Sequence, residues 1–234
     1  MRSARAAAAE FIGTALLLCA IVGSGIMAQR LFGANVGLAL LANAVATGGA
    51  LAALILAFGS ISGAHFNPCV TLADAWQGGL ARVVVVLYIV AQFAGALCGT
   101  ALANSMFGLP PFVMSGHVRD GSGMFVSEFV ATFGLLAVIL GCLRARSVAT
   151  PYAVALYIVG AYWFAPSTSF ANPAVTIARS LTDTFAGIRP QDSPAFIVAQ
   201  IAGAFAATTL FAWLSPIPKR ASEATTVPHL EVAV

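Results

Sequence analysis

Long apolar runs constrain the fold of this chain more than any other feature. They lie at about residues 7–28, 36–58, 82–106, 124–143, 148–164 and 194–214. Most reach about 20 residues, the length that a helix needs to cross the hydrocarbon core of a bilayer. Only 8% of the residues are charged, whereas a soluble domain usually carries about a quarter. The sequence therefore predicts an all-α integral membrane protein with six transmembrane helices, rather than a soluble helical protein.

Two short stretches between these runs are nearly identical in pattern. Residues 62–71 read SGAHFNPCVT, and residues 167–176 read STSFANPAVT. Asn is a preferred helix N-cap and Pro a preferred first helical residue, so each Asn-Pro pair predicts a loop that abruptly begins a helix. The apolar segments that follow, at about 70–76 and 174–181, are too short to cross a bilayer. We therefore expect two half-helices in addition to the six spans.

The two halves of the chain repeat each other, at about residues 7–106 and 124–214. Each half has a Glu-bearing span, a second span, an Asn-Pro stretch and a Gln-bearing span, in that order. The segments AEFI and YIVAQFAGA of the first half return as SEFV and FIVAQIAGA in the second. Three crossings per half is an odd number, so the halves enter the membrane from opposite sides. The pattern predicts an inverted repeat that carries both Asn-Pro loops towards the midplane.

The basic residues predict the orientation of the chain. One side of the membrane would hold Arg2, Arg5, Arg82, Arg144, Arg146, Lys219 and Arg220, and the other Arg30, Arg119, Arg179 and Arg189. This excess places both termini in the cytoplasm by the positive-inside rule. We expect residues 1–234 to form one multi-pass domain in the inner (plasma) membrane, with residues 215–234 as a cytoplasmic tail.

The two half-helices predict a pore. Irregular backbone at membrane depth is tolerated where it lines a water-filled cavity, so two half-helices meeting head to head could leave their loops along a channel. The backbone carbonyls expected to line it belong to Gly63, Ala64, His65, Ser167 and Thr168. If each Asn oxygen caps its own helix, Asn67 and Asn172 keep free NH2 donors at the narrow centre.

Such a lining suits small uncharged polar solutes. A neutral hydroxylic molecule donates to carbonyls and accepts from Asn, whereas two positive helix ends repel a cation. No nucleophile–base pair, phosphate loop or metal-type spacing occurs, so we expect no enzyme, no cofactor and no metal site. The basic residues lie singly or in pairs at the ends of apolar runs and suggest no nucleic-acid partner. The lipid bilayer, water and small neutral solutes are the expected partners.

Two other hypotheses fit an inverted repeat. One is a secondary transporter of a small neutral solute that works by alternating access. It would need a coupling site, and no ionisable residue flanks the Asn-Pro loops near the centre of the predicted pore. The other is a scaffold with a closed pore.

On these motifs the chain resembles the major intrinsic protein family, the aquaporins and aquaglyceroporins, over about residues 7–214. The resemblance rests on the motifs Asn67-Pro68-Cys69 and Asn172-Pro173-Ala174 in an inverted repeat. It implies six tilted spans and two half-helices, one pore per protomer and usually a homotetramer. It also implies that Glu10 and Glu128 are buried and brace the pore loops.

The chain departs from the family pattern in two places. Cys69 stands where the family usually has Ala, and Val175 where it usually has the Arg of the selectivity filter. Counting along the resemblance, the other filter positions are Thr47, Gly160 and Ser169. This small, uncharged set implies a wide filter, similar to that of bacterial members suspected of passing metalloid hydroxides such as arsenous acid, besides glycerol-like solutes and water. Whether Arg179, one turn beyond Val175, reaches the pore stays open at this point.

Overall fold

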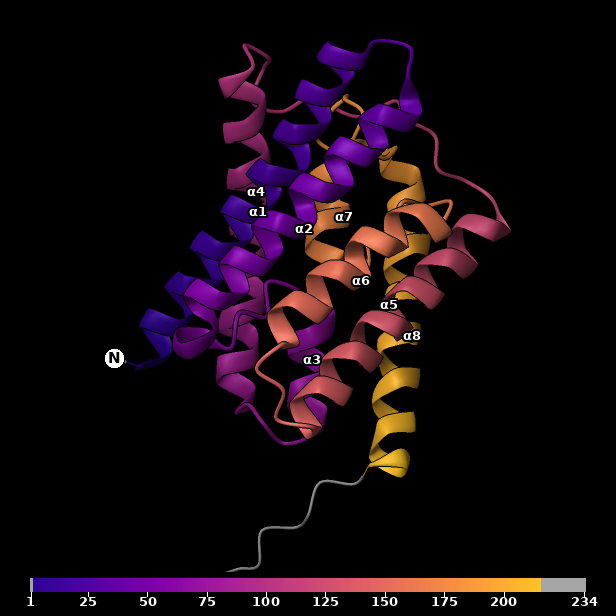
Figure 1. Cartoon of the computed structure of the whole chain (residues 1–234). Helices are drawn as coiled ribbons and strands as arrows, with labels where there is room; N and C mark the ends of the chain where they lie inside the picture. Colours follow the sequence, from indigo (N-terminus) through magenta and orange to yellow (C-terminus); the bar gives the residue numbers. More distant parts are fainter. Residues whose placement is uncertain (1, 216–234) are drawn as a thin grey trace, which may run out of the picture.

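The computed structural model describes residues 2–215, and the predicted tail from residue 216 onwards lies outside the described residues. Two short helices lie inside a bundle of longer ones (Figure 1). The elements are α1 (Arg2–Phe32), α2 (Val36–Ser62), α3 (Pro68–Trp76), α4 (Arg82–Met106), α5 (Ser122–Arg144), α6 (Thr150–Phe164), α7 (Pro173–Arg179), the 3-10 turn η1 (Pro190–Asp192) and α8 (Ser193–Leu214). The all-helical class predicted from the sequence is confirmed.

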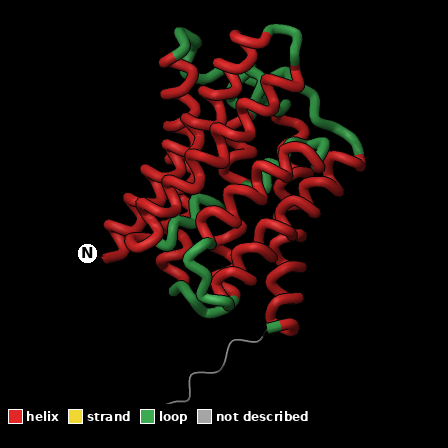
Figure 2. Tube along the Cα trace, in the orientation of Figure 1, coloured by secondary structure: helices red, strands yellow, loops and turns green. Residues whose placement is uncertain are grey.

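Five of the helices are long and apolar enough to cross a membrane, namely α1, α2, α4, α5 and α8. The sixth predicted span corresponds to α6, which has only 15 residues. At 1.5 Å per residue α6 is about 22 Å long, shorter than a hydrocarbon core of about 30 Å. An irregular segment, residues 165–172, continues from α6 into the interior of the bundle (Figure 2).

The two half-helices begin as their Asn-Pro pairs predict. Asn67 is extended at φ −153°, and its side-chain oxygen accepts from the N–H of Cys69 at 2.8 Å. Asn172 is extended at φ −159° and accepts from the N–H groups of Ala174 and Val175, at 3.0 and 3.3 Å. A proline at the first helical position follows each cap. The prediction of two half-helices, α3 and α7, is confirmed.

Equivalent helices pair closely in the two halves, α1 with α4 and α5 with α8 (Figure 1). A Cβ atom on Gly95 would lie 2.3 Å from the carbonyl oxygen of Phe11, and one on Gly203 would lie 2.4 Å from that of Phe129. Backbones can approach this closely only where one of them carries no side chain. The two glycines therefore fix the same interhelical distance in both halves of the inverted repeat.

The first turn of α1 lies at the lower left of Figure 1 and the last turn of α8 at the bottom, both in the lower half of the bundle as drawn. α3 lies in the half of the bundle nearer to these ends, and α7 in the other half. We call the side with the chain ends the terminal side and the opposite side the far side. The N-terminal ends of α3 and α7 face each other in the interior.

Candidate functional site: the meeting point of the half-helices

Each Asn of the paired motifs contacts the opposite half of the molecule. Nδ2 of Asn67 donates to the carbonyl oxygen of Ala171 at 2.7 Å, and Nδ2 of Asn172 donates to that of Phe66 at 2.8 Å. The sequence predicted that both NH2 groups are free, and this is wrong in part: one hydrogen of each group is already bonded to the opposite loop. The second hydrogen of each group is available to the cavity, since both asparagines line it.

Glu10 of α1 holds the first loop in place. Its Oε1 accepts from the hydroxyl of Ser62 at 2.6 Å and from the N–H of His65 at 3.0 Å. Its Oε2 accepts from the N–H of Phe66 at 2.7 Å and from Nε2 of Gln92 at 2.8 Å. The carboxylate is fully buried, and these four donors satisfy both of its oxygens.

Glu128 of α5 does the same for the second loop. Its two oxygens accept from the N–H groups of Phe170 and Ala171, at 2.8 and 2.9 Å, and from Nε2 of Gln200 at 2.6 Å. Glu128 is also fully buried. A buried carboxylate is costly unless it is hydrogen-bonded, so both loops depend on these two glutamates for their shape.

A glutamine and a threonine extend each brace to the half-helix. Nε2 of Gln92 donates to Oγ1 of Thr71 and Nε2 of Gln200 to Oγ1 of Thr176, both at 2.9 Å. Each threonine hydroxyl in turn donates to the carbonyl oxygen of the Asn that caps its helix. The sequence marked the glutamines as repeated, but only the fold shows that they join the loops to α4 and α8.

Both loops have a left-handed backbone at the same relative positions. The residues with positive φ are Gly63 (88°), Ala64 (51°) and Phe66 (49°) in the first loop, and Thr168 (63°), Ser169 (52°) and Ala171 (48°) in the second. Non-glycine residues in this region cost about 1–3 kcal/mol each. The hydrogen bonds to Glu10 and Glu128 offset this cost. With this backbone conformation, two consecutive N–H groups of each loop can donate to the same buried carboxylate.

A single cavity of about 790 Å³ passes the meeting point of the half-helices. On the terminal side its lining includes Gln77, Arg144 and Ser215, and on the far side Tyr162 and Arg179. Apolar side chains from α1, α2, α5 and α6 form much of the wall between them. The cavity thus runs from the terminal side past the meeting point of the half-helices to the depth of Thr47, Tyr162 and Arg179.

Eight of the residues predicted from the sequence line this cavity: Thr47, Gly63, Ala64, His65, Asn67, Ser169, Asn172 and Val175. The described lining does not include Pro68, Cys69, Pro173, Ala174, Gly160, Ser167 or Thr168. Cys69 is fully buried, so its thiol lies away from the pore. The carbonyl oxygen of Ser167 accepts from Arg119, so it is directed at a side chain and not at the cavity.

Gly160, a predicted filter residue, lies on the outer face of α6 and not on the face that lines the cavity. The lining residues of α6 recur every fourth position, at Thr150, Val154, Ile158 and Tyr162. Gly160 is two residues from Tyr162, about 200° around a helix with 3.6 residues per turn. It is exposed, as is Trp163 beside it. Tyr162 instead lines the cavity, and its hydroxyl lies 3.1 Å from Oγ1 of Thr47.

Two buried arginines flank Phe170 on the far side of the cavity. The guanidinium carbons of Arg179 and Arg119 lie 3.4 and 5.0 Å from the centre of its ring, within the range of a cation–π interaction. Nε of Arg179 donates to the carbonyl oxygen of Ala186. Arg179 lines the cavity, which answers the question that the sequence left open.

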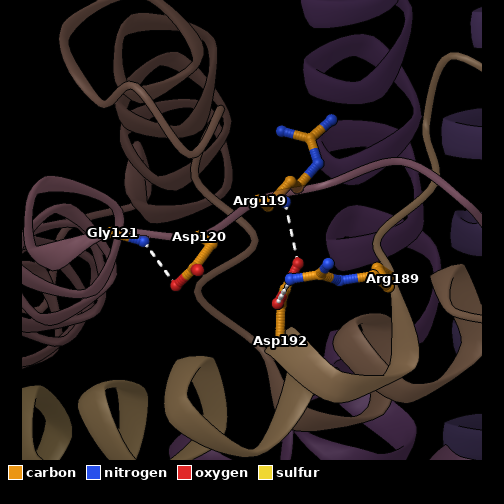
Figure 3. A network of polar contacts seen from close by, with 5 residues as sticks. All are labelled: Arg119, Asp120, Gly121, Arg189 and Asp192. Atoms are coloured by element: carbon orange, nitrogen blue, oxygen red, sulfur yellow. Dashed lines mark hydrogen bonds and ion pairs between the residues drawn. The ribbon is translucent and has the colours of Figure 1, made fainter.

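Arg119 comes from the long loop between α4 and α5. Its Nε donates to the carbonyl oxygen of Gly187 at 2.8 Å, and Nη1 donates to that of Ser167 at 2.9 Å. Its backbone N–H donates to Asp192 at 2.9 Å, while the Asp192 carboxylate pairs with Arg189 at 2.7 Å (Figure 3). The guanidinium points away from that pair (Figure 3). Burial lowers the pKa of Arg119 to about 10, so it stays charged at neutral pH.

Sequence reasoning missed Tyr162, Phe170 and Arg119. The four-residue spacing of Ile158 and Tyr162 could have indicated the lining face of α6. Phe170 directly follows Ser169, a predicted filter residue, so its position next to the cavity could have been predicted. Nothing in the sequence indicated Arg119, because the position of a residue in a long loop depends on tertiary contacts.

Comparisons with known proteins agree with this architecture. The model of the family described as major intrinsic protein matches residues 1–165 and 142–234. Aquaglyceroporin AqpS of Rhizobium meliloti (strain 1021) is 53% identical over 210 residues, 90% of either chain. Aquaporin Z of Bradyrhizobium diazoefficiens is 30% identical over 228 residues, 90% of this chain and 93% of the relative.

A solved structure gives the same fold. The X-ray structure of the aquaglyceroporin from Plasmodium falciparum matches with a TM-score of 0.68, covering 89% of this chain and 95% of that one. At 23% sequence identity this likeness concerns the fold alone. The family match, the two relatives that cover most of the chain and the paired half-helices lead to one conclusion: the chain belongs to the major intrinsic protein family.

Proposed function

We propose that the protein is a passive channel for small uncharged polar solutes, namely glycerol-sized polyols, metalloid hydroxides such as arsenous acid, and water. Membership of the major intrinsic protein family makes it a membrane channel for water and small solutes, and not an enzyme. The observation that carries the solute class is the cavity that passes two asparagine NH2 groups at the meeting point of α3 and α7.

The lining of the cavity supports this solute class. Apolar side chains make up most of the wall, and polar side chains lie at the centre and towards both ends of the cavity. A mainly apolar site with a smaller number of polar groups is typical of one that orients a small molecule. Both half-helices direct their N-terminal ends at the centre, and this positive end disfavours cations. Tyr162 and Arg179 make the far end of the lining more aromatic and more polar than the sequence predicted. The 53% identical relative is named an aquaglyceroporin, in keeping with polyol permeation.

Stopped-flow swelling of proteoliposomes tests the proposal. Vesicles with the protein should swell faster than empty vesicles in inward gradients of glycerol and of arsenous acid, and shrink faster under an impermeant osmolyte. Rates that stay at the level of empty vesicles for all three would contradict a channel. A coupled transporter would instead show saturable flux that depends on an ion gradient, so the assay is repeated after the gradients are collapsed.

We further propose that both termini are cytoplasmic, in the plasma membrane. Lys219 and Arg220 lie outside the described residues, and without them the terminal side still carries five arginines against four. Two of those four, Arg119 and Arg179, are buried in the protein and do not lie at a membrane surface. The arginines that can lie at a membrane surface are therefore more numerous on the terminal side, and the positive-inside rule favours that side as cytoplasmic. Protease accessibility of a tag after residue 234, in sealed cells and after permeabilisation, checks this.

We also propose that the protein assembles as a homotetramer, as the family resemblance implies. The lipid-facing helices expose large apolar side chains, such as Val83, Val86 and Val90 along α4, and these suit either lipid or a second copy. Light scattering of the purified protein in detergent gives the mass of the complex. A monomer mass in several mild detergents would contradict the assembly but not the channel.

A further inference from the structure

The far end of the cavity holds hydrogen-bond donors that lack acceptors. Arg179 is only 2% exposed and lines the cavity, yet neither of its Nη atoms donates to any residue in the described part of the chain. Ser169 is 3% exposed and also lines the cavity, and its hydroxyl has no partner among the described residues. Buried polar groups are nearly always hydrogen-bonded in folded proteins, so the Ser169 hydroxyl and the Arg179 Nη atoms are expected to bind a molecule inside the cavity.

The same region holds two guanidinium groups, of Arg119 and Arg179, that form no direct ion pair in the described residues. The guanidinium carbons of Arg179 and Arg119 lie 3.4 and 5.0 Å from the centre of one ring, that of Phe170, so the two guanidinium groups are close to each other. In residues 2–215 the only ion pair is between Arg189 and Asp192. Two like charges buried close together repel each other, and a nearby anion would offset that repulsion.

The nearby carboxylates do not supply that anion. The charge of Glu128 acts on both arginines, but its oxygens already accept from two loop N–H groups and from Gln200. Asp183 accepts from the N–H of Gly116, and Asp192 is bound to Arg189 and to the backbone of Arg119. None of these three carboxylates forms an ion pair with Arg119 or Arg179, so neither guanidinium has a direct anionic partner in the described residues.

We propose that Arg179 and Ser169 form a binding site for a small oxyanion, such as a carboxylate or a phosphate, at the far end of the pore. A guanidinium offers parallel N–H donors that match the two oxygens of such a group, and the Ser169 hydroxyl supplies a third donor. Arg119 acts through its charge and by holding Ser167 and Phe170 in position. The site rests on these side chains, while its effect on solute flux rests also on the proposed channel function.

An oxyanion bound there would block neutral solutes. Arg179, Ser169 and Tyr162 line the same cavity as the asparagines at the centre, so a bound ion and a permeating solute compete for one path. The site would make the flux of neutral solutes depend on the concentration of small oxyanions on the far side of the membrane.

The binding is measured on the whole protein in detergent, with inorganic phosphate and formate as probes. The thermal midpoint should rise with either anion in a saturable way, and sodium chloride at equal ionic strength should have less effect. Arg179→Met should weaken the apparent affinity about tenfold or more, and Arg179→Lys by less, because Lys keeps the charge but not the fork. Arg30→Met is the matched control, since Arg30 also stacks on a phenylalanine, Phe107, but is exposed outside the cavity.

The same variants are then reconstituted, and swelling in glycerol is followed with phosphate on both sides of the membrane. Wild type and Arg30→Met should be inhibited, and Arg179→Met should not. Should Arg179→Met fail to fold, Ser169→Ala leaves the arginine in place and must still weaken the phosphate response several-fold. An equal response to phosphate and chloride, or a wild-type response in Arg179→Met or Ser169→Ala, would overturn the site. Binding without any glycerol flux would instead count against the channel and leave the site intact.

Discussion

The two Asn-Pro loops share one scaffold and differ in what they present to the cavity. A shift of 105 residues converts one into the other, and Asn67, Thr71 and Phe66 then coincide with Asn172, Thr176 and Ala171. The two members of each pair make equivalent bonds, within their own half or, for the Asn Nδ2 groups, to the opposite half. The same shift pairs His65 with Phe170 and Asp74 with Arg179, which differ completely in chemistry.

This difference separates folding from selectivity. The shared residues satisfy buried backbone groups, and any change at them leaves polar atoms unpaired inside the bundle. The differing residues line the cavity at its two ends, a carboxylate on the terminal side and a guanidinium on the far side. The side chain of Arg119 bonds to Ser167 and Gly187, both in the second half. The two halves therefore share the support of the pore and differ at its two ends.

The largest expected effect is the loss of a brace. Glu10→Gln and Glu128→Gln each replace one acceptor oxygen by a donor facing loop N–H groups, at a cost of about 2–6 kcal/mol for the groups left unpaired. Glu10 accepts four hydrogen bonds and Glu128 three, so the first variant should be the less stable. Thermal midpoints and yields in detergent measure this, with the exposed Asp120→Asn as control. Wild-type midpoints in both variants would show that the loops hold their shape without the carboxylates.

The next effect concerns the bonds that cross between the halves. Asn67→Ala and Asn172→Ala should each cost about 1–2 kcal/mol for the cap and about 1 kcal/mol for the crossing bond. Asn172→Ser keeps a hydroxyl oxygen that can cap the helix and loses the Nδ2 donor, so it should be affected less than Asn172→Ala. Thermal midpoints and glycerol flux per folded protein are compared. Equal losses in the Ala and Ser variants would show that a cap oxygen alone restores nothing.

The sequence predicted the scaffold far better than the filter. The Asn-Pro pairs act within a few residues of themselves, so local propensity placed α3 and α7 correctly. The repeated order of Glu, Asn-Pro and Gln also indicated which positions correspond. The filter instead depends on the rotation of α6 and on a residue from a distant loop. Gly160 and Tyr162 are only two residues apart on α6, yet they lie on opposite faces of the helix. The sequence of α6 is almost wholly apolar, so no local pattern shows which of these faces lines the cavity.

A smaller effect is expected from adding a charge to each half in turn. Val70 and Val175 correspond under the 105-residue shift, and both line the cavity. Val175→Arg adds a further guanidinium to the part of the cavity that Tyr162 and Arg179 line, so glycerol flux should fall about tenfold more than water flux. Val70→Arg lies in the half that contains neither of these residues and should reduce both fluxes more evenly. Paired swelling measurements per folded protein give the two ratios. Equal ratios in the two variants would show that neither end of the pore discriminates by size.

The smallest expected effect distinguishes the two faces of α6. Gly160→Leu puts a side chain on an exposed surface where nothing lies within 4 Å of the new Cβ, and surface changes usually alter free energies by less than about 0.5 kcal/mol. Glycerol and water flux should therefore stay within about twofold of wild type, since that energy corresponds to about a factor of two in rate. Tyr162→Leu is the matched change on the lining face, and it should shift the glycerol-to-water ratio because it removes both the phenol ring and its contact with Thr47. If Gly160→Leu blocks glycerol in a folded protein while Tyr162→Leu leaves the ratio unchanged, then α6 presents the opposite face to the pore, and the small filter of Thr47, Gly160, Ser169 and Val175 is the correct one.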